Sequence, residues 1–178
     1  MTVKILVVAM LLAPLLTAQD GEWVLAVSSL TYRVSTPLPI SQGASHAARG
    51  KGFCQSAQCS FEVSVAMKSF ASGDPRFDLL MMQTFRGAYF PLAKVRMMLP
   101  SADLTASSFR CAVEIEFAGQ KLTYRDVAFQ TSPSLMGPRV IGTIPAKLSD
   151  FKIDLPSLPI PARNELPIVV DMTWRPGP

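Results

Sequence analysis

The sequence predicts an all-β protein: about eight short antiparallel strands, with one short helix inserted between them. Apolar and polar residues alternate with a period of two in run after run, which is the pattern of strands with one buried face. Fifteen prolines and ten glycines are spread along the 178 residues; they would interrupt long helices but suit turns between strands. An apolar content of 49% with 17% charged residues excludes an intrinsically disordered chain. The length suits one domain with one core.

The first 18 residues have the pattern of a secretory signal peptide. Lys4 gives a basic start, residues 5–16 are almost wholly apolar, and Ala18 is the small residue before a polar stretch. The apolar run is shorter than the roughly 20 residues of a membrane-spanning helix, although an uncleaved anchor is the alternative. We therefore expect residues 19–178 to form the mature domain, and the protein to be periplasmic or secreted.

Strand-like alternation then recurs along the chain. It covers residues 23–28, 59–68, 94–99, 109–117, 121–129, 139–148 and 166–175, and a small, polar strand is expected within 43–53. Each of these strands has one apolar face to bury. In one chain of this length, a closed barrel or a sandwich buries all these faces together, and closure also removes exposed sheet edges.

One segment, residues 74–87, has the spacing of a helix instead. Its start is indicated by Asp74 and Pro75, and its end by Gly87. The apolar residues at helical spacing are Phe77, Leu80, Met81 and Phe85.

The three cysteines fit an exported protein. Cys54 and Cys59 flank a predicted turn, so a disulfide across the end of a hairpin is geometrically reasonable. Cys111 is left over within an alternating apolar run, where we expect a small buried residue.

The sequence lacks the common motifs of catalytic, metal-binding and phosphate-binding sites, so we expect no catalytic residues, no metal and no enzymatic activity. His46 is the single histidine, which excludes multi-histidine metal sites. The chain has no glycine-rich phosphate loop, no paired CxxC and no G-x-S-x-G elbow. Glu114 and Glu116 share one strand face, which we interpret as a solvated face opposite the core.

The charge pattern constrains the partners. Basic residues are interspersed rather than clustered, so no nucleic-acid partner is expected. The pI of about 9.1 gives a modest preference for anionic partners, such as a transiently contacted membrane surface. His46, which is close in sequence to Arg49 and Lys51, is a candidate for contact with an anionic head group, and an ordinary surface histidine is the alternative. The oligomeric state is left open.

The inward-facing residues are more informative. An eight-stranded barrel is about wide enough either to be filled by side chains or to hold one slender ligand. Both alternatives stay open: a carrier of a flexible apolar ligand, or a structural or stress-related interaction protein with a filled core. The strand residues expected to line the interior are Phe61, Val63, Val65, Met97, Leu99, Phe109, Val113, Ile115, Leu122 and Ile168, and the helix residues expected to cover it are Leu80, Met81 and Phe85.

Several segments resemble the YceI-like family. Residues 70–78, followed by 86–91, resemble its "SF-x-SG-x-x-x-RD … P" segment, and residues 122–124 resemble its "LT-(aromatic)" strand. Residues 151–158 resemble its late "F-x-(V/I)-x-R-PSL" segment. The chain departs from these motifs in that Phe77 replaces the arginine before Asp78, and Leu155 replaces the late arginine.

This resemblance implies a lipocalin-like antiparallel β-barrel that is exported and holds a long polyisoprenoid chain or another long-chain lipid. It implies no cofactor other than such a bound lipid. Arg76 and Asp78, which lie at the family's Arg-Asp motif, are by this resemblance the further candidates for contacts with the head group of that lipid. The pair Cys54 and Cys59 also looks like one found in some exported members of the family.

Overall fold

The computed structural model describes residues 20–35, 42–154 and 163–178. The expected signal peptide, residues 1–18, lies outside the described residues, and so do residues 155–158 of the late YceI-like segment.

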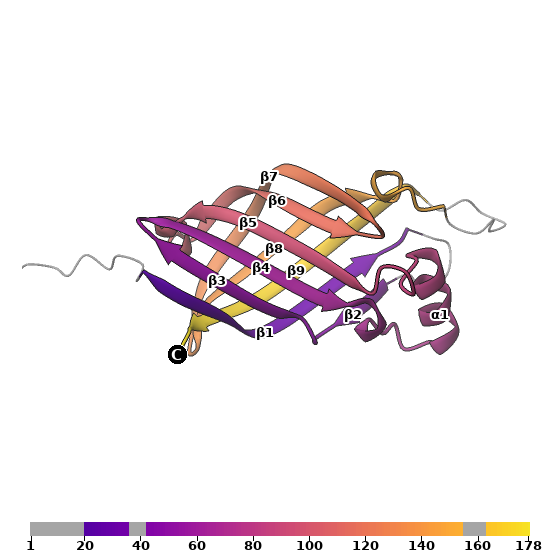
Figure 1. Cartoon of the computed structure of the whole chain (residues 1–178), viewed down its shortest axis with the longest axis horizontal. Helices are drawn as coiled ribbons and strands as arrows, with labels where there is room; N and C mark the ends of the chain where they lie inside the picture. The colour runs from indigo at the N-terminus through magenta and orange to yellow at the C-terminus, as the bar shows by residue number, and fades with distance from the viewer. Residues whose placement is uncertain (1–19, 36–41, 155–162) are drawn as a thin grey trace, which may run out of the picture.

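The described strands form one antiparallel sheet that closes on itself (Figure 1). β9 pairs back onto β1, so that eight strands make a closed barrel and β2 is added beside β1. The predicted closed antiparallel barrel with one inserted helix is therefore confirmed. The strands are β1 (Gly21–Arg33), β2 (Gln42–Ser45), β3 (Arg49–Gln55), β4 (Gln58–Ala66), β5 (Leu92–Pro100), β6 (Ser108–Phe117), β7 (Gln120–Ser134), β8 (Gly137–Lys147) and β9 (Glu165–Pro176).

The small, polar strand expected within residues 43–53 is divided into β2 and β3. Both pair with β1 in one continuous register, with Leu30 opposite Ser45 and Val24 opposite Lys51. Between them the ladder is interrupted, and His46 Nδ1 lies 3.2 Å from the carbonyl oxygen of Ser28 instead. β2 is thus the continuation of β3 beyond a break in the barrel wall.

Helix α1 (Pro75–Thr84) lies at one end of the barrel, at the right in Figure 1. It begins as predicted, because the Asp74 carboxylate accepts a hydrogen bond from the backbone N–H of Arg76 at 2.9 Å. It ends before Gly87, because Arg86 already has left-handed backbone with φ of 56°. Three single 3₁₀ turns complete the described elements: η1 (Met67–Ser69), η2 (Ser101–Leu104) and η3 (Ser149–Phe151). None of the described helices is both long and apolar enough to cross a bilayer.

A β-bulge in β1 changes which of its residues face the core. The pairing with β9 shifts between Leu25 and Val27, which leaves Ala26 as the extra residue. Val27 consequently points outward and is exposed, whereas Leu30 and Tyr32 are buried. Strict alternation in residues 23–28 predicts that Val27 lies on the same face as Leu25. This part of the prediction is wrong.

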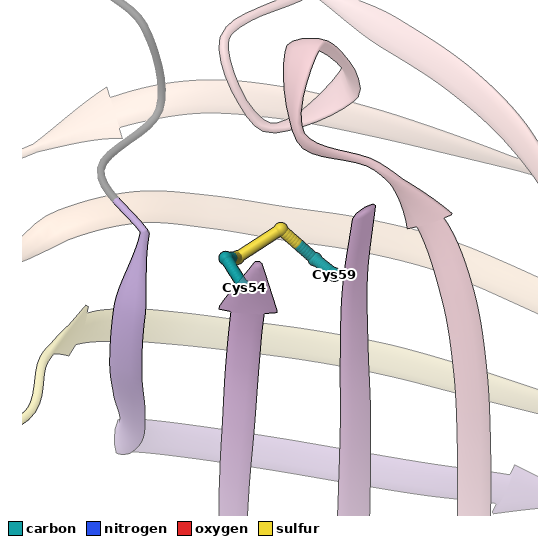
Figure 2. Close-up of a disulfide and its surroundings, with 2 residues drawn as sticks. All are labelled: Cys54 and Cys59. Atoms are coloured by element: carbon teal, nitrogen blue, oxygen red, sulfur yellow. A yellow bond between two sulfur atoms is a disulfide. The ribbon is translucent and has the colours of Figure 1, made fainter. Parts of the chain in front are cut away.

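Cys54 and Cys59 are bonded at the end of the β3–β4 hairpin (Figure 2). The two residues face each other across the ladder, with their Cα atoms 4.0 Å apart. Ser56 and Ala57 form the turn between them, both with positive φ, as a two-residue hairpin turn of type I′ requires. Both sulfurs are buried in the core, and Cys111 is free and buried.

Removing this disulfide in a Cys54→Ala/Cys59→Ala variant is expected to lower the free energy of unfolding by about 2 kcal/mol, since the bridge closes a short loop. Urea unfolding monitored by circular dichroism measures the change. The wild-type protein with its disulfide reduced should approach the same value. A double variant as stable as the oxidised wild type would show that the hairpin needs no covalent link.

Candidate functional site

The predicted inward-facing residues meet in one apolar core. Eight of the ten strand residues are buried there, from Phe61 on β4 to Ile115 on β6, and Leu122 and Ile168 are half-buried at its margin. From α1 and its C-cap, Met81 and Phe85 are buried and Leu80 is half-buried. The structure therefore brings these side chains together, while their part in holding a ligand stays a prediction.

A continuous row of aromatic rings closes the end of the barrel beneath α1. Phe85 lies in the middle, with its ring centroid 5.1 Å from that of Tyr32 and 5.1 Å from that of Phe117. The row extends from Tyr32 to Phe70 at 5.4 Å, and from Phe117 to Phe151 at 5.0 Å. Most of these rings meet edge to face, a favourable arrangement for buried aromatic side chains.

Sequence reasoning predicted only Phe85 from this row as an interior residue. Phe117 was predictable from the sequence, because it lies on the same face of its strand as Phe109 and Ile115. Tyr32 was not, because the bulge in β1 shifts the alternation of buried and exposed residues before it. Burial, followed by the nearby Asp78 carboxylate, raises the pKa of the Tyr32 hydroxyl, so it stays neutral at physiological pH.

The opposite half of the interior contains a small apolar cavity. Its volume is about 10 Å³, about the space of one water molecule. Its lining is entirely apolar: Phe61, Met97, Leu99, Leu104, Phe109, Phe129, Val140, Val170, Met172 and Trp174. An interior open enough for a hydrocarbon chain is thus not found at this cavity, where side chains nearly fill the barrel.

Two glycines explain how such large side chains fit inside. Gly52 lies opposite Phe61 on the paired strand, and Gly142 lies opposite Phe129. A Cβ atom at either glycine would collide with the facing aromatic ring. The two rings therefore lie over the backbone of the facing glycines. This arrangement fills the interior and also fixes the register of the paired strands.

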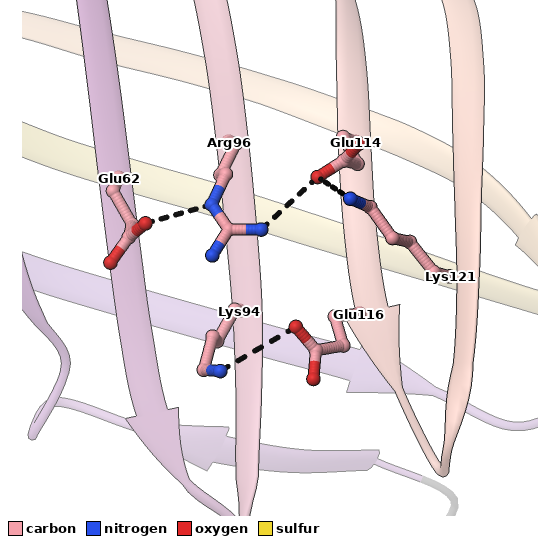
Figure 3. Close-up of polar contacts among 6 residues, drawn as sticks. All are labelled: Glu62, Lys94, Arg96, Glu114, Glu116 and Lys121. Atoms are coloured by element: carbon pink, nitrogen blue, oxygen red, sulfur yellow. Dashed lines mark hydrogen bonds and ion pairs between the residues drawn. The ribbon is translucent and has the colours of Figure 1, made fainter.

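On the outer face, charged side chains form a ladder across β4, β5, β6 and β7 (Figure 3). Arg96 donates to Glu62 at 2.7 Å and to Glu114 at 3.2 Å, and Lys121 lies 3.0 Å from Glu114. Glu62, Arg96 and Glu114 form part of the lining of a groove of about 800 Å³. The exposed Phe53 and Met98 line the same groove. Glu114 is thus paired with cations on a solvated face, as expected for a surface residue.

We expect an Arg96→Gln variant to raise the pKa of Glu62 most. The hydrogen bond from Arg96 is the main cause that lowers the Glu62 pKa, whereas Lys121 is the first cause for Glu114. Both carboxyls have a lower pKa in the folded protein, so their ion pairs stabilise it above pH about 4.3. That contribution is lost as the pH falls through the lowered values.

Carboxyl titration by NMR measures both shifts. Arg139→Gln, whose partner is Asp171 elsewhere on the surface, is the matched control. An unchanged Glu62 pKa in Arg96→Gln would contradict the assignment of the ladder.

The predicted head-group residues are not gathered into one polar site. Asp78 accepts a hydrogen bond from the backbone N–H of Ser72 at 2.8 Å, and Arg76 is exposed beside Asp74. His46 lies at the break between β2 and β3, and within the described ranges no hydrogen bond or ion pair joins it to Arg76 or Asp78. The described part of the chain also contains no cluster of three or more potential metal ligands.

Comparison with known proteins rests on structure. No protein-family model matches the sequence, and no curated protein matches it. A polyisoprenoid-binding domain from Saccharophagus degradans, implicated in plant cell wall breakdown, superposes with a TM-score of 0.69 at 14% identity, covering 89% of this chain and 100% of that one. The YceI protein of Campylobacter jejuni gives a TM-score of 0.54 at 10% identity over 100% of this chain and 94% of its own. This chain has the YceI-like fold.

A further solved structure, BcnA of Burkholderia cenocepacia, has a TM-score of 0.67 at 16% identity, covering 82% of this chain and 94% of that one. At such identities the likeness concerns the fold. The expectation of a YceI-like, lipocalin-like barrel is confirmed at that level.

Proposed function

We propose that this protein binds a long apolar chain, a polyisoprenoid or another long-chain lipid, inside its barrel and catalyses no reaction. The observation that carries the proposal is the wholly apolar lining of the interior cavity. A hydrocarbon chain needs such a wall and no polar partner. The likeness to a structure described as a polyisoprenoid-binding domain supports the same ligand class.

Because the cavity is small, the ligand has to displace side chains to enter. Met97 and Met172 line the cavity, and the unbranched methionine side chain adapts to irregular shapes. Burying roughly 600 Å² of hydrocarbon at about 25 cal/mol per Å² yields on the order of 15 kcal/mol in total. Ordering the flexible chain and repacking the interior offset much of this, which leaves an ordinary binding affinity.

The absence of catalysis and the export are part of the proposal. Burial raises the pKa of the Cys111 thiol to about 11, so that it is protonated and a poor nucleophile at neutral pH. The buried disulfide suits an oxidising compartment, as does the signal-like pattern of residues 1–18.

A second candidate is a structural or stress-related interaction protein whose barrel stays filled. The cavity of only about 10 Å³ favours it. In that case the outer groove with Phe53 and Met98 is the surface available for contacts, since apolar side chains are exposed there.

Solvent extraction and native mass spectrometry of the purified mature protein test the proposal. We expect one apolar molecule per chain, or stoichiometric uptake of added polyprenol by protein stripped of its ligand. Protein that releases no apolar molecule and takes up no polyprenol would overturn lipid binding and favour the filled barrel.

A further inference from the structure

Strands β7 and β8 separate along much of their length. They pair from Phe129 opposite Gly142 to Ser134 opposite Gly137, next to their hairpin turn. Beyond Phe129 towards the α1 end, residues 120–128 of β7 pair only with β6, and residues 143–147 of β8 pair only with β9. Figure 1 shows β7 curving away from β8 there. We call this gap in the ladder the β7–β8 seam.

Two features of the sequence keep the seam open. The register of β6 with β7 shifts between Cys111 and Val113, where Asp126 has left-handed backbone with φ of 61°. This bulge bends β7 away from β8. Pro145 on β8 lies directly opposite Pro167 on β9. Two opposed prolines cannot exchange hydrogen bonds, so the nitrogen of Pro145 faces β7, where the ladder lacks its N–H.

The seam is covered by η3, which contacts both β7 and β8. Phe151 of η3 is fully buried at the end of the aromatic row. Asp150 Oδ2 accepts hydrogen bonds from the Tyr124 hydroxyl at 2.7 Å and from the Lys147 N–H at 3.0 Å. Among the described residues, the bond from Tyr124 is the one hydrogen bond between η3 and β7.

On its other side η3 is fastened firmly, next to β9. The backbone N–H of Leu148 donates to the carbonyl of Asn164 at 3.0 Å, and the N–H of Ser149 donates to the side chain of Asn164 at 2.9 Å. Opening between η3 and β7 therefore breaks a single side-chain hydrogen bond and no backbone ladder.

An outer groove leads to the point where the seam begins. Its volume is about 660 Å³, and Phe109, Phe129 and Gly142 are part of its lining. Phe109 and Phe129 also line the interior cavity, and their rings are stacked with centroids 5.2 Å apart. At this point these two residues line both the outer groove and the cavity.

We propose that the apolar ligand enters the barrel sideways through the β7–β8 seam, with the Tyr124–Asp150 hydrogen bond as the latch. This inference rests on the proposed function. The chain of the ligand lies first in the outer groove, and β7 moves away from η3 when the latch breaks. The rings of Phe129 and Phe151 then give way to the ligand, whose apolar surface stays in contact with apolar side chains.

A second, shorter seam does not provide an equivalent route. β5 and β6 pair only from Lys94 to Met97, and η2 with its buried Leu104 lies beside their unpaired ends. Two backbone hydrogen bonds hold the segments on either side of it: Ser101 N–H donates to the Ala57 carbonyl at 2.9 Å, and Thr131 N–H donates to the Ser107 carbonyl at 2.9 Å. Among the described residues no hydrogen bond joins η2 to β6, so this seam has no counterpart of the Tyr124–Asp150 bond.

Stopped-flow binding of all-trans-retinol tests this route. Retinol is an isoprenoid alcohol that accepts energy from excited tryptophan, and Trp174 lines the cavity. In a Trp23→Phe background Trp174 is the only tryptophan left. Tyr124→Phe keeps the ring and removes the latch, so we expect association and dissociation rate constants both to rise about 5- to 10-fold, the factor for an ordinary hydrogen bond.

The dissociation constant should stay within about twofold of the wild-type value. The Tyr124–Asp150 hydrogen bond is present in both the free and the bound protein and is broken only while the ligand passes, so its loss changes both rate constants by a similar factor. Tyr89→Phe, on an exposed tyrosine outside the seam, is the matched control. Circular dichroism establishes that each variant is folded before its kinetics are compared.

The outcomes separate the two levels of inference. Faster rates in Tyr124→Phe, with Tyr89→Phe at the wild-type rates, support entry through the β7–β8 seam. Unchanged rates in Tyr124→Phe with retinol still bound overturn this route and leave the proposed function intact. If neither retinol nor polyprenol binds to the wild-type protein, both fall.

Discussion

Replacing Phe85 with alanine is expected to lower the free energy of unfolding by about 3–5 kcal/mol, the range for truncating a fully buried phenylalanine. Phe85 is 1% exposed and contacts both Tyr32 and Phe117. Its removal leaves a cavity between rings that are fixed by separate strands, so the surrounding side chains cannot collapse into the space. Two edge-to-face contacts are lost together with the buried area.

Chemical denaturation monitored by circular dichroism measures this loss. Phe53→Ala is the matched control, since Phe53 lies on the outer face and is 48% exposed. We expect that variant to change stability by less than about 1 kcal/mol. A Phe85→Ala protein as stable as Phe53→Ala would show that the row of rings beneath α1 does not hold the end of the barrel.

Replacing Val113 with tryptophan is expected to reduce retinol or polyprenol uptake at least about tenfold, while the protein still folds cooperatively. Val113 is fully buried on β6, in the middle of the interior face. A carrier has to enlarge its interior when it binds, so the added indole takes the space that the ligand would use. Overpacking lowers stability at the same time, by about 1–3 kcal/mol.

Ala112→Trp provides the comparison, because Ala112 is the neighbouring residue on the exposed face of the same strand. It should bind ligand like the wild type. The contrary result is a Val113→Trp protein that fails to fold cooperatively while the Ala112→Trp protein folds normally. It would show that the interior has no capacity to expand, and it would favour the filled barrel with an interaction surface outside.

The two proposals make different demands on the interior. Lipid binding requires side chains that move, and the methionines and the stacked rings around the cavity meet that requirement more readily than β-branched residues would. The seam is a route on which few interactions have to break, because β7 and β8 already lack backbone pairing where η3 covers them. Uptake through this route would leave the remaining strand pairs of the barrel intact.

Some features of this protein were determined by local sequence. The period-two alternation in residues such as 59–68 and 109–117 predicted the buried faces, because successive side chains on a strand point to opposite sides whatever the strand packs against. The start of α1 followed from Asp74 and Pro75, since a cap and a fixed φ act within one turn of the chain.

Other features were decided only by the tertiary structure. Val27 faces outward because a bulge in β1, opposite β9, shifts the alternation of inward and outward residues by one. The bulge depends on pairing with a strand far away in the sequence, so the residues around Val27 do not predict it. The row of rings around Phe85 forms from segments far apart in the chain. The filled interior depends on which glycine lies opposite which aromatic residue, and the seam depends on the bulge at Asp126 of β7 coinciding with Pro145 on the neighbouring strand β8. Alternation fixes which face of a strand is buried, whereas closure of the barrel decides what each buried side chain meets and how much space remains.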